Sequence, residues 1–141
     1  MKYIVFMVLI CTLLQAQTFR KNSLKVVIDT NTNLMWIDTI DVLKIKKEHE
    51  KAIEYCKNLV FAGYSNWRIP TIDEFKTIVN KKNHKNYINY AFKYNVPDGY
   101  WAFKAHWRTL WFYADYMHFI SGTPYYDSRH KKKYVRCVRS I

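Results

Sequence analysis

Two cysteines, Cys56 and Cys137, constrain the fold of this 141-residue chain more than any other feature. The third cysteine, Cys11, lies in an apolar N-terminal segment that we expect to be removed, which leaves one pair. Two distant cysteines are too few for a metal site, and the sequence contains no Cys-x-x-Cys pair. In an oxidising compartment such a pair forms a disulfide. We therefore predict a Cys56–Cys137 bond that ties the middle of the chain to its end.

The N-terminal segment determines the compartment. Lys2 gives a positive start, residues 4–14 form an apolar run, and Ala16 is a small residue suited to the position before a cut. A run of about eleven residues fits the core of a signal peptide, whereas a membrane span needs about 20. We predict a signal peptide over residues 1–16 and export to the periplasm or the medium. A buried N-terminal element and a lipoprotein anchored at Cys11 are the alternatives, and bulky Ile10 disfavours the lipoprotein.

The rest of the chain is long enough for one domain with a substantial core. Its hydrophobic content of 50% argues against disorder. The formal net charge of +12 predicts attraction to polyanions: sulfated or phosphorylated glycans, acidic envelope polymers or nucleic acid. The alternative is a solvated basic surface without a specific partner.

Local patterns predict an α+β domain over residues 24–141, after a short lead-in at residues 17–23. Residues 25–28 and 34–37 are rich in strand-forming side chains. The stretch between them, residues 29–33, is dense in turn-forming Asp, Asn and Thr. Together they predict an opening β-hairpin.

Two helices are expected next. The first covers residues 45–61, where apolar residues recur at helical spacing, and Gly63 lies where a left-handed stop would fall. The second begins at Thr71, which forms a capping box with Glu74 after Pro70. The core face of the first helix is expected to carry Ala52, Ile53, Cys56, Leu59 and Val60.

A small antiparallel sheet is expected in the C-terminal half, after irregular structure over residues 87–98. Its short strands are predicted at residues 100–103, 109–113, 117–120 and 134–139, separated by Gly- and Pro-containing turns and a basic loop. Large aromatic side chains are expected in or near the core. These are Trp36, Trp67, Trp101 and Trp111.

Four segments, in this order, resemble a known family. They are Asp29-Thr30 leading to Leu34-Met35-Trp36; Ala52 with Tyr55-Cys56 and Leu59; Gly63 to Thr71 with Glu74-Phe75; and Tyr134 to Arg139. Together they resemble the collagen-like-protein C-terminal domain family (Lcl C-terminal domain), a domain of unknown function, over about residues 24–141. The layout is similar to the C-type lectin-like fold, in which a cysteine on the first helix bridges to one on the last strand. One departure is that Tyr100-Trp101 is followed here by Ala102-Phe103 instead of the family's small hydroxylated residues.

The corner between the two helices is predicted to be structural. The forked guanidinium of Arg68 can satisfy several acceptors, so we expect it to pair with a carboxylate or with carbonyls. The residues assigned to this role are Trp67, Arg68, Pro70, Thr71 and Glu74.

We predict no enzymatic activity, no metal and no cofactor. Arg68 to Thr71 is similar to a corner of formylglycine-generating enzymes, but those need active-site cysteines, and both cysteines here are expected to be paired. The spacing of His106, His118 and His130 matches no nucleophile with its base and no metal pair. The sequence contains no calcium-binding lectin loop. The most similar segment, Val96-Pro97-Asp98, has no side-chain oxygen at Val96 to bind calcium.

The concentrated functional signal is a basic loop near the C-terminus with tyrosines beside it. Cations in such a loop meet sulfate or phosphate, while tyrosine rings stack on sugars or bases. At least one member of the resembled family is an adhesin for sulfated glycans, so we expect a polyanionic glycan or acidic envelope polymer as partner, not nucleic acid. A structural or assembly role in the cell envelope is the alternative. The expected ligand-binding residues are Arg129, Lys131, Lys132, Lys133, Arg136, Tyr125 and Tyr126, and a second basic cluster comprises Lys81, Lys82 and Lys85.

Overall fold

The computed structural model describes residues 15–141, so residues 1–14 of the predicted signal peptide, Cys11 among them, lie outside it. The described residues form an α+β domain with two α-helices, two sheets and one disulfide, which confirms the predicted fold class. The helices are α1 (His49–Lys57) and α2 (Ile72–Ile78), and 3-10 helices span Ile40–Leu43 and Trp107–Thr109. The strands are β1 (Thr18–Lys21), β2 (Val26–Asp29), β3 (Leu34–Ile37), β4 (Lys46–Lys47), β5 (Gly99–Ala105), β6 (Tyr113–His118), β7 (Thr123–Ser128), β8 (Lys133–Tyr134) and β9 (Val138–Ser140).

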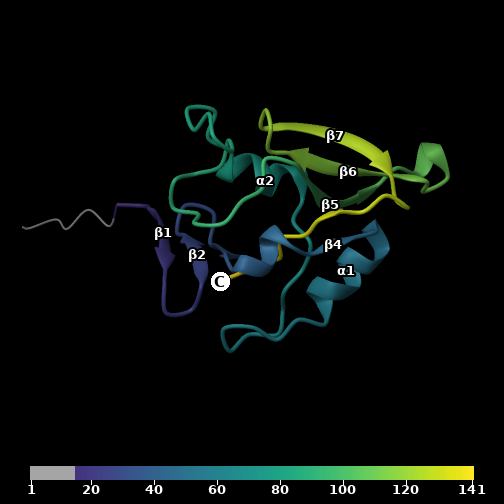
Figure 1. Cartoon of the computed structure of the whole chain (residues 1–141). Coiled ribbons are helices and arrows are strands. Elements are labelled where there is room, and N and C mark those ends of the chain that lie inside the picture. The colour runs from purple at the N-terminus through teal and green to yellow at the C-terminus, as the bar shows by residue number, and fades with distance from the viewer. Residues whose placement is uncertain (1–14) are drawn as a thin grey trace, which may run out of the picture.

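The first sheet has the order β1-β2-β3-β9 and is antiparallel throughout. Its centre is the predicted opening hairpin, in which Val27 pairs with Trp36 and both side chains are buried. Asn33 closes the turn at φ 53°, a left-handed conformation that Asn adopts more readily than most residues. β1 lies in the predicted lead-in and pairs with β2, so the folded domain begins before residue 24. Figure 1 shows this hairpin end at the left.

The second sheet has the order β4-β8-β5-β6-β7, and β5 pairs with β8 in parallel while the other pairs are antiparallel. The strand predicted at residues 109–113 is wrong, because the chain there leaves β5 through a 3-10 helix and a loop. β7 forms where Gly122 and Pro124 indicated a turn. Pro124 is accommodated because β7 is an edge strand, where a missing backbone N–H breaks no central ladder.

Helix α1 is shorter than the helix predicted over residues 45–61. Its expected first turn is instead the short strand β4, which pairs with β8 and so holds the chain extended. Ala52 and Cys56 are buried as expected. Val60 lies beyond the helix end and its side chain is 74% exposed, so it is not part of the core face.

Helix α2 begins at the predicted capping box. The hydroxyl of Thr71 accepts a hydrogen bond from the backbone N–H of Glu74 at 3.2 Å, and the Glu74 carboxylate accepts one from the N–H of Thr71 at 2.9 Å. This reciprocal pair satisfies two helix-terminal donors. Phe75 and Ile78 on the inner face are buried.

The core lies where α2 packs between the two sheets. The ring of Phe75 is 5.7 Å from that of Trp36 on the first sheet and 5.9 Å from that of Phe119, which follows β6. Trp36, Trp67 and Trp101 are buried as predicted. Trp111 is 56% exposed, so its assignment to the core was wrong: it lies in the loop between β5 and β6, not in a strand.

The predicted disulfide is confirmed. Cys56 on α1 bonds to Cys137, which precedes β9, across a sequence separation of 81. Both residues are buried, with 0% and 1% exposure. The bond therefore fastens α1 to the first sheet from inside the core.

Candidate functional site

An open groove of about 570 Å³ runs along α1. It is formed by β4, by α1 with the residues that follow it, and by the loop that connects β7 to β8. Lysines dominate its charged lining. The lining residues are Lys46, Lys47, Lys51 and Lys132, with Glu48, Glu54, Tyr55, Asn58 and Leu59.

Strand pairing brings the distant parts of this groove together. Lys47 of β4 lies opposite Lys133 of β8, and this places the adjoining Lys132 beside the start of α1. Lys51, in the first turn of α1, lines the same groove as Lys47. The sequence pattern indicated Lys132 through its basic run but gave no sign of the groove, because the groove depends on the pairing of β4 with β8.

The groove is positively charged, because its acidic residues neutralise only part of the charge of its lysines. Lys51 Nζ lies 3.3 Å from Glu54 Oε2, whereas neither Lys46 nor Lys132 makes an ion pair within residues 15–141. Lys47 Nζ lies 5.3 Å from the centre of the Tyr55 ring. Burial, together with the charge of Asp41, raises the pKa of Tyr55, so its phenol is protonated at neutral pH and can donate a hydrogen bond.

The three lysines of the predicted basic loop have different surroundings. Lys132 is exposed and lines the groove. Lys131 is 65% exposed, with Nζ 3.3 Å from Asp127. Lys133 is only 14% exposed: its Nζ lies 3.0 Å from Asp127 and 3.9 Å from the centre of the Tyr116 ring. Burial alone would raise the pKa of Asp127, but hydrogen bonds from Lys133, the Ser128 N–H and Lys131 hold it below its ordinary value.

Buried His49 anchors this loop to α1. Its Nδ1 accepts a hydrogen bond of 3.0 Å from Arg129 Nε, so the neutral ring donates through Nε2 to the carbonyl of Ala102 at 2.7 Å. Burial is the main cause that lowers the pKa of His49, and the Arg129 charge adds to it. Arg129, predicted to bind ligand, thus also positions the loop.

Arg136 was assigned to the ligand-binding set, and its burial corrects that assignment. Its side chain is buried and donates to the carbonyl of Ile37 at 2.6 Å and to the carbonyl of Tyr94. Its Nη1 also lies 3.4 Å from Asp38, whose carboxylate accepts a 2.6 Å hydrogen bond from Arg20. The strand predicted over residues 134–139 is interrupted: β8 ends at Tyr134, β9 begins at Val138, and the three residues between them, Arg136 included, are all buried.

The two predicted tyrosines are neighbours on β7, and neighbours on a strand point to opposite faces. Tyr125 lies 6.0 Å from the ring of Tyr116, on the face where Lys133 stacks. Tyr126 lies 5.4 Å from the ring of His106. Both tyrosines are exposed, but only Tyr125 lies on the side of the sheet where Lys133 lies.

One comparison with known proteins is positive. The Lcl C-terminal domain family matches residues 25–139. The chain belongs to this family. No curated protein and no solved structure matches the chain, so the similarity to the C-type lectin-like fold stays a prediction.

In this Lcl C-terminal domain the corner between the helices makes structural contacts. Arg68 forms two hydrogen bonds with the carboxylate of Glu74, at 2.6 and 2.7 Å. The backbone of Arg68 pairs with Val138 of β9, and the indole of Trp67 donates to the carbonyls of Phe61 and Tyr64. The Arg68 side chain is 43% exposed, so its ion pair with Glu74 is partly open to solvent, whereas Trp67 is buried.

The histidines of the Lcl domain do not converge. His106 pairs with Asp115, and His130 lies against the ring of Phe112. Over residues 15–141, no group of three or more His, Cys, Asp or Glu side chains is placed to hold a metal. In the same part of the chain, no helix is long and apolar enough to cross a membrane.

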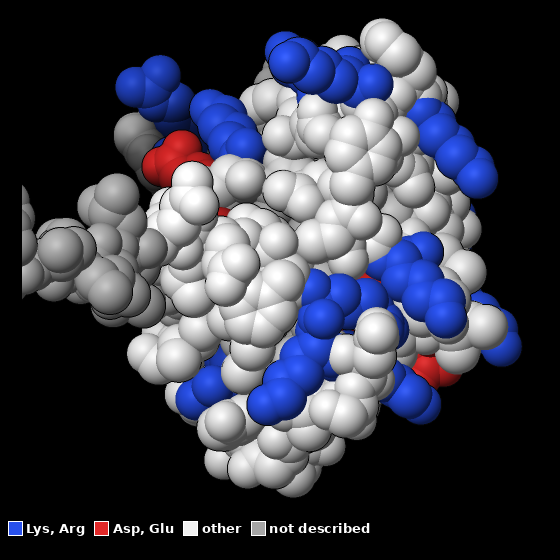
Figure 2. Space-filling model, turned by 90° about the vertical axis from the view of Figure 1, so that its left-hand side faces the viewer, with Lys and Arg blue, Asp and Glu red and all other residues white. Residues whose placement is uncertain are grey.

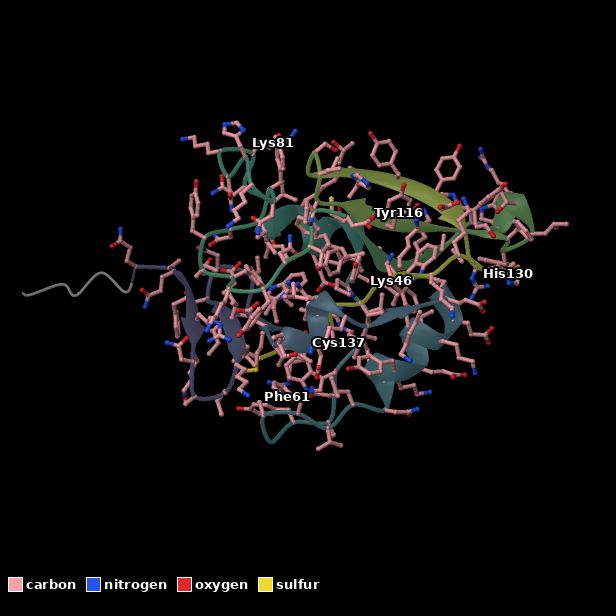
Figure 3. All side chains as sticks on the ribbon, viewed as in Figure 1. Lys46, Phe61, Lys81, Tyr116, His130 and Cys137 are labelled. Atoms are coloured by element: carbon pink, nitrogen blue, oxygen red, sulfur yellow. A yellow bond between two sulfur atoms is a disulfide. The ribbon has the colours of Figure 1, made fainter. Side chains whose placement is uncertain are left out.

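Basic side chains are spread over the Lcl domain. Figure 2 shows the hairpin end face-on, where Lys and Arg predominate in separate groups and little acidic surface is visible. Lys81, in the second predicted cluster, and His130, in the basic loop, lie at opposite ends of the molecule in Figure 3. The two clusters therefore form no single site. The groove along α1 differs from the other basic surface in its hollow shape as well as in its charge.

Proposed function

We propose that this chain is an exported, non-catalytic binding module that holds a sulfated or carboxylated glycan in the groove along α1. The observation that carries the proposal is the convergence of four lysines on this one groove: Lys46, Lys47, Lys51 and Lys132. Ammonium groups bind sulfate and carboxylate through charge-assisted hydrogen bonds, which are stronger than neutral ones. Tyr55 adds a ring and a hydroxyl that suit a sugar.

The glutamates in the groove leave its positive character intact. Glu54 is paired with Lys51, and the lysines outnumber Glu48 and Glu54 together. A carboxylate among the cations also supplies an acceptor for sugar hydroxyls, which a purely cationic surface lacks. The groove therefore suits a glycan that carries both charge and hydroxyl groups.

The buried disulfide supports the exported location, because such bonds persist mainly in oxidising compartments. It agrees with the signal peptide expected over residues 1–16. The proposed place of action is the periplasm or the exterior of the cell.

Two variants with the same loss of charge test the groove. The groove variant combines Lys46→Gln, Lys51→Gln and Lys132→Gln, and the control combines Lys81→Gln, Lys82→Gln and Lys85→Gln; all six lysines are exposed. With heparin as probe, the groove variant is expected to bind about tenfold or more weakly, a loss of roughly 1.4 kcal/mol or more. The control is expected to change affinity by less than about twofold, since distant exposed charges are screened.

Equal losses in the two variants would show that binding follows net charge, and that the groove is not a site. Unchanged binding in the groove variant would exclude it directly. Thermal unfolding of all three proteins provides the folding control, because exposed charges contribute little to stability.

A further inference from the structure

A loop at the far end of the second sheet exposes large apolar side chains. It connects β5 to β6 and forms the projection at the right of Figure 1. Leu110 is 88% exposed, Trp107 64%, Trp111 56% and Phe112 48%; these four residues are called the aromatic tip. Soluble domains rarely expose adjoining large apolar groups unless these contact a partner or a membrane.

The backbone holds the aromatic tip in a costly conformation. Leu110 and Trp111 are consecutive residues with φ 52° and 62°, in the left-handed region that residues with a Cβ avoid. Hydrogen bonds fix it: the N–H groups of Leu110 and Trp111 donate to the carbonyls of Trp107 and His106, each at 3.0 Å. Such strained backbone, held by its surroundings, is concentrated at functional sites.

The aromatic tip is fastened to the basic loop. Arg129 donates its backbone N–H to the carbonyl of Phe112 at 2.9 Å and its guanidinium to the carbonyl of Trp111 at 3.2 Å. The ring of Phe112 lies 5.4 Å from that of His130, which Figure 3 places at this end of the molecule. The guanidinium of Arg108 lies 5.5 Å from the Trp107 ring. The apolar side chains of the aromatic tip therefore lie next to the guanidinium groups of Arg108 and Arg129.

We propose that the aromatic tip inserts into the interfacial layer of a lipid leaflet that carries anionic headgroups. Trp side chains favour that layer because one end of the ring is apolar and the other is polar. Arg108, which lies against the Trp107 ring, and Lys131, which adjoins His130, are both exposed and would then meet lipid phosphates.

Charge favours an anionic lipid leaflet over a second copy of the chain as the partner of the aromatic tip. Two copies of this strongly basic chain, whose full sequence carries a net charge of +12, repel each other, whereas an anionic leaflet attracts the same surface. Glu48 and Glu50 line the hollow of about 270 Å³ beneath the aromatic tip. Their carboxylates would limit insertion to the tip itself. This proposal does not depend on the glycan groove.

Vesicles of phosphatidylcholine with about one quarter phosphatidylglycerol provide the probe, and pure phosphatidylcholine is the reference. The tip variant combines Trp107→Ser, Leu110→Ser and Trp111→Ser. The control combines Val60→Ser, Tyr90→Ser and Ile120→Ser, which are also exposed but lie outside the loop. Co-flotation of the tip variant with the anionic vesicles is expected to fall about tenfold or more, because the inserted apolar area is lost. The control is expected to bind like the parent.

Tryptophan fluorescence reports insertion in the unaltered chain. Trp36, Trp67 and Trp101 are at most 3% exposed, so brominated acyl chains can quench only the exposed tryptophans, Trp107 and Trp111. Quenching on the anionic vesicles supports insertion. Vesicle binding without quenching, or undiminished binding of the tip variant, overturns the proposal.

Two further measurements separate the alternatives. If the parent dimerises through the tip and does not bind vesicles, the occupant is a second copy and the proposal is wrong. The tip variant is expected to retain heparin affinity, so a failure here is distinguishable from a failure of the glycan groove. Circular dichroism and an unchanged thermal midpoint show that the variant is folded.

Discussion

The hairpin end and the tip end of the molecule treat a tryptophan and a left-handed backbone position in opposite ways. At the hairpin end Trp36 is buried, and Asn33 occupies the left-handed position of the turn. At the tip end Trp111 is exposed, and Leu110 occupies the left-handed position. The hairpin end packs its tryptophan inside the core, whereas the tip end leaves large apolar side chains facing outward.

This difference separates residues that hold the fold together from residues free to bind. Arginine shows it most clearly: Arg136 is buried among protein acceptors, whereas Arg108 is exposed beside Trp107. Substitutions that affect the interior of the hairpin end should reduce stability, and substitutions at the tip end should reduce binding. The predictions below test this division.

The largest expected effect comes from removing the disulfide. The double variant Cys56→Ser, Cys137→Ser frees a loop with a sequence separation of 81, and we expect it to lose about 4 kcal/mol of unfolding free energy. Denaturant unfolding under non-reducing conditions measures the loss. A change below about 1 kcal/mol would show that packing around α1 suffices without the covalent link.

Next in size is Arg136→Gln. The change removes a buried cation from beside Asp38 and takes the donor from the carbonyls of Ile37 and Tyr94. We expect a cost of about 3 kcal/mol, although Arg20 still pairs with Asp38. The matched change at the tip end, Arg108→Gln, is expected to alter stability by less than about 0.5 kcal/mol. Equal effects of the two substitutions in chemical denaturation would remove the contrast between the ends.

Local signals in the sequence predicted the opening hairpin and the start of α2 well. The turn at residues 29–33 and the capping box at Thr71 are each complete within a few residues, so neighbours alone determine them. The second sheet was harder to predict, because its pairings join distant segments. β4 replaces the first turn of the predicted helix only because β8 lies beside it, and β7 was hidden by Gly122 and Pro124.

In the candidate site, too, the residues that a local pattern indicates were predicted, and those that distant pairing brings in were not. Lys132 was predicted from its own basic run, but Lys46 and Lys51 join it through a strand pair that no local pattern shows. Arg136 was misassigned because its sequence neighbourhood is basic, whereas the segment between β8 and β9 that contains it is buried throughout. Trp111 was placed in the core on residue type alone, whereas its environment is set by the loop.

A smaller effect is expected from pH, through His49 at the base of the basic loop. Burial lowers its pKa below the ordinary 6.5, so the unfolded chain binds the proton more readily than the folded chain. Stability is therefore expected to fall as the pH drops below about 6.5 toward the folded pKa. The lowered pKa of Glu74 acts in a separate window, below its ordinary 4.5.

Thermal midpoints between neutral and mildly acidic pH measure this dependence. His49→Gln should flatten the curve in that range, whereas His84→Gln, at an exposed position, should leave it as in the parent. A curve for His49→Gln that still falls like the parent's would assign the dependence to another group.

The smallest expected change in stability is an increase, and it comes from a pair of substitutions that compares the two ends directly. Leu110→Asn relieves a left-handed leucine whose side chain is 88% exposed, and we expect a gain of up to about 1 kcal/mol in stability. The reverse change at the hairpin end, Asn33→Leu, introduces the same strain and should cost a similar amount. The stabilised Leu110→Asn protein should bind anionic vesicles more weakly than the parent. A variant that is more stable and binds equally well would mean that the strain serves no binding role, because stability then improves without functional loss.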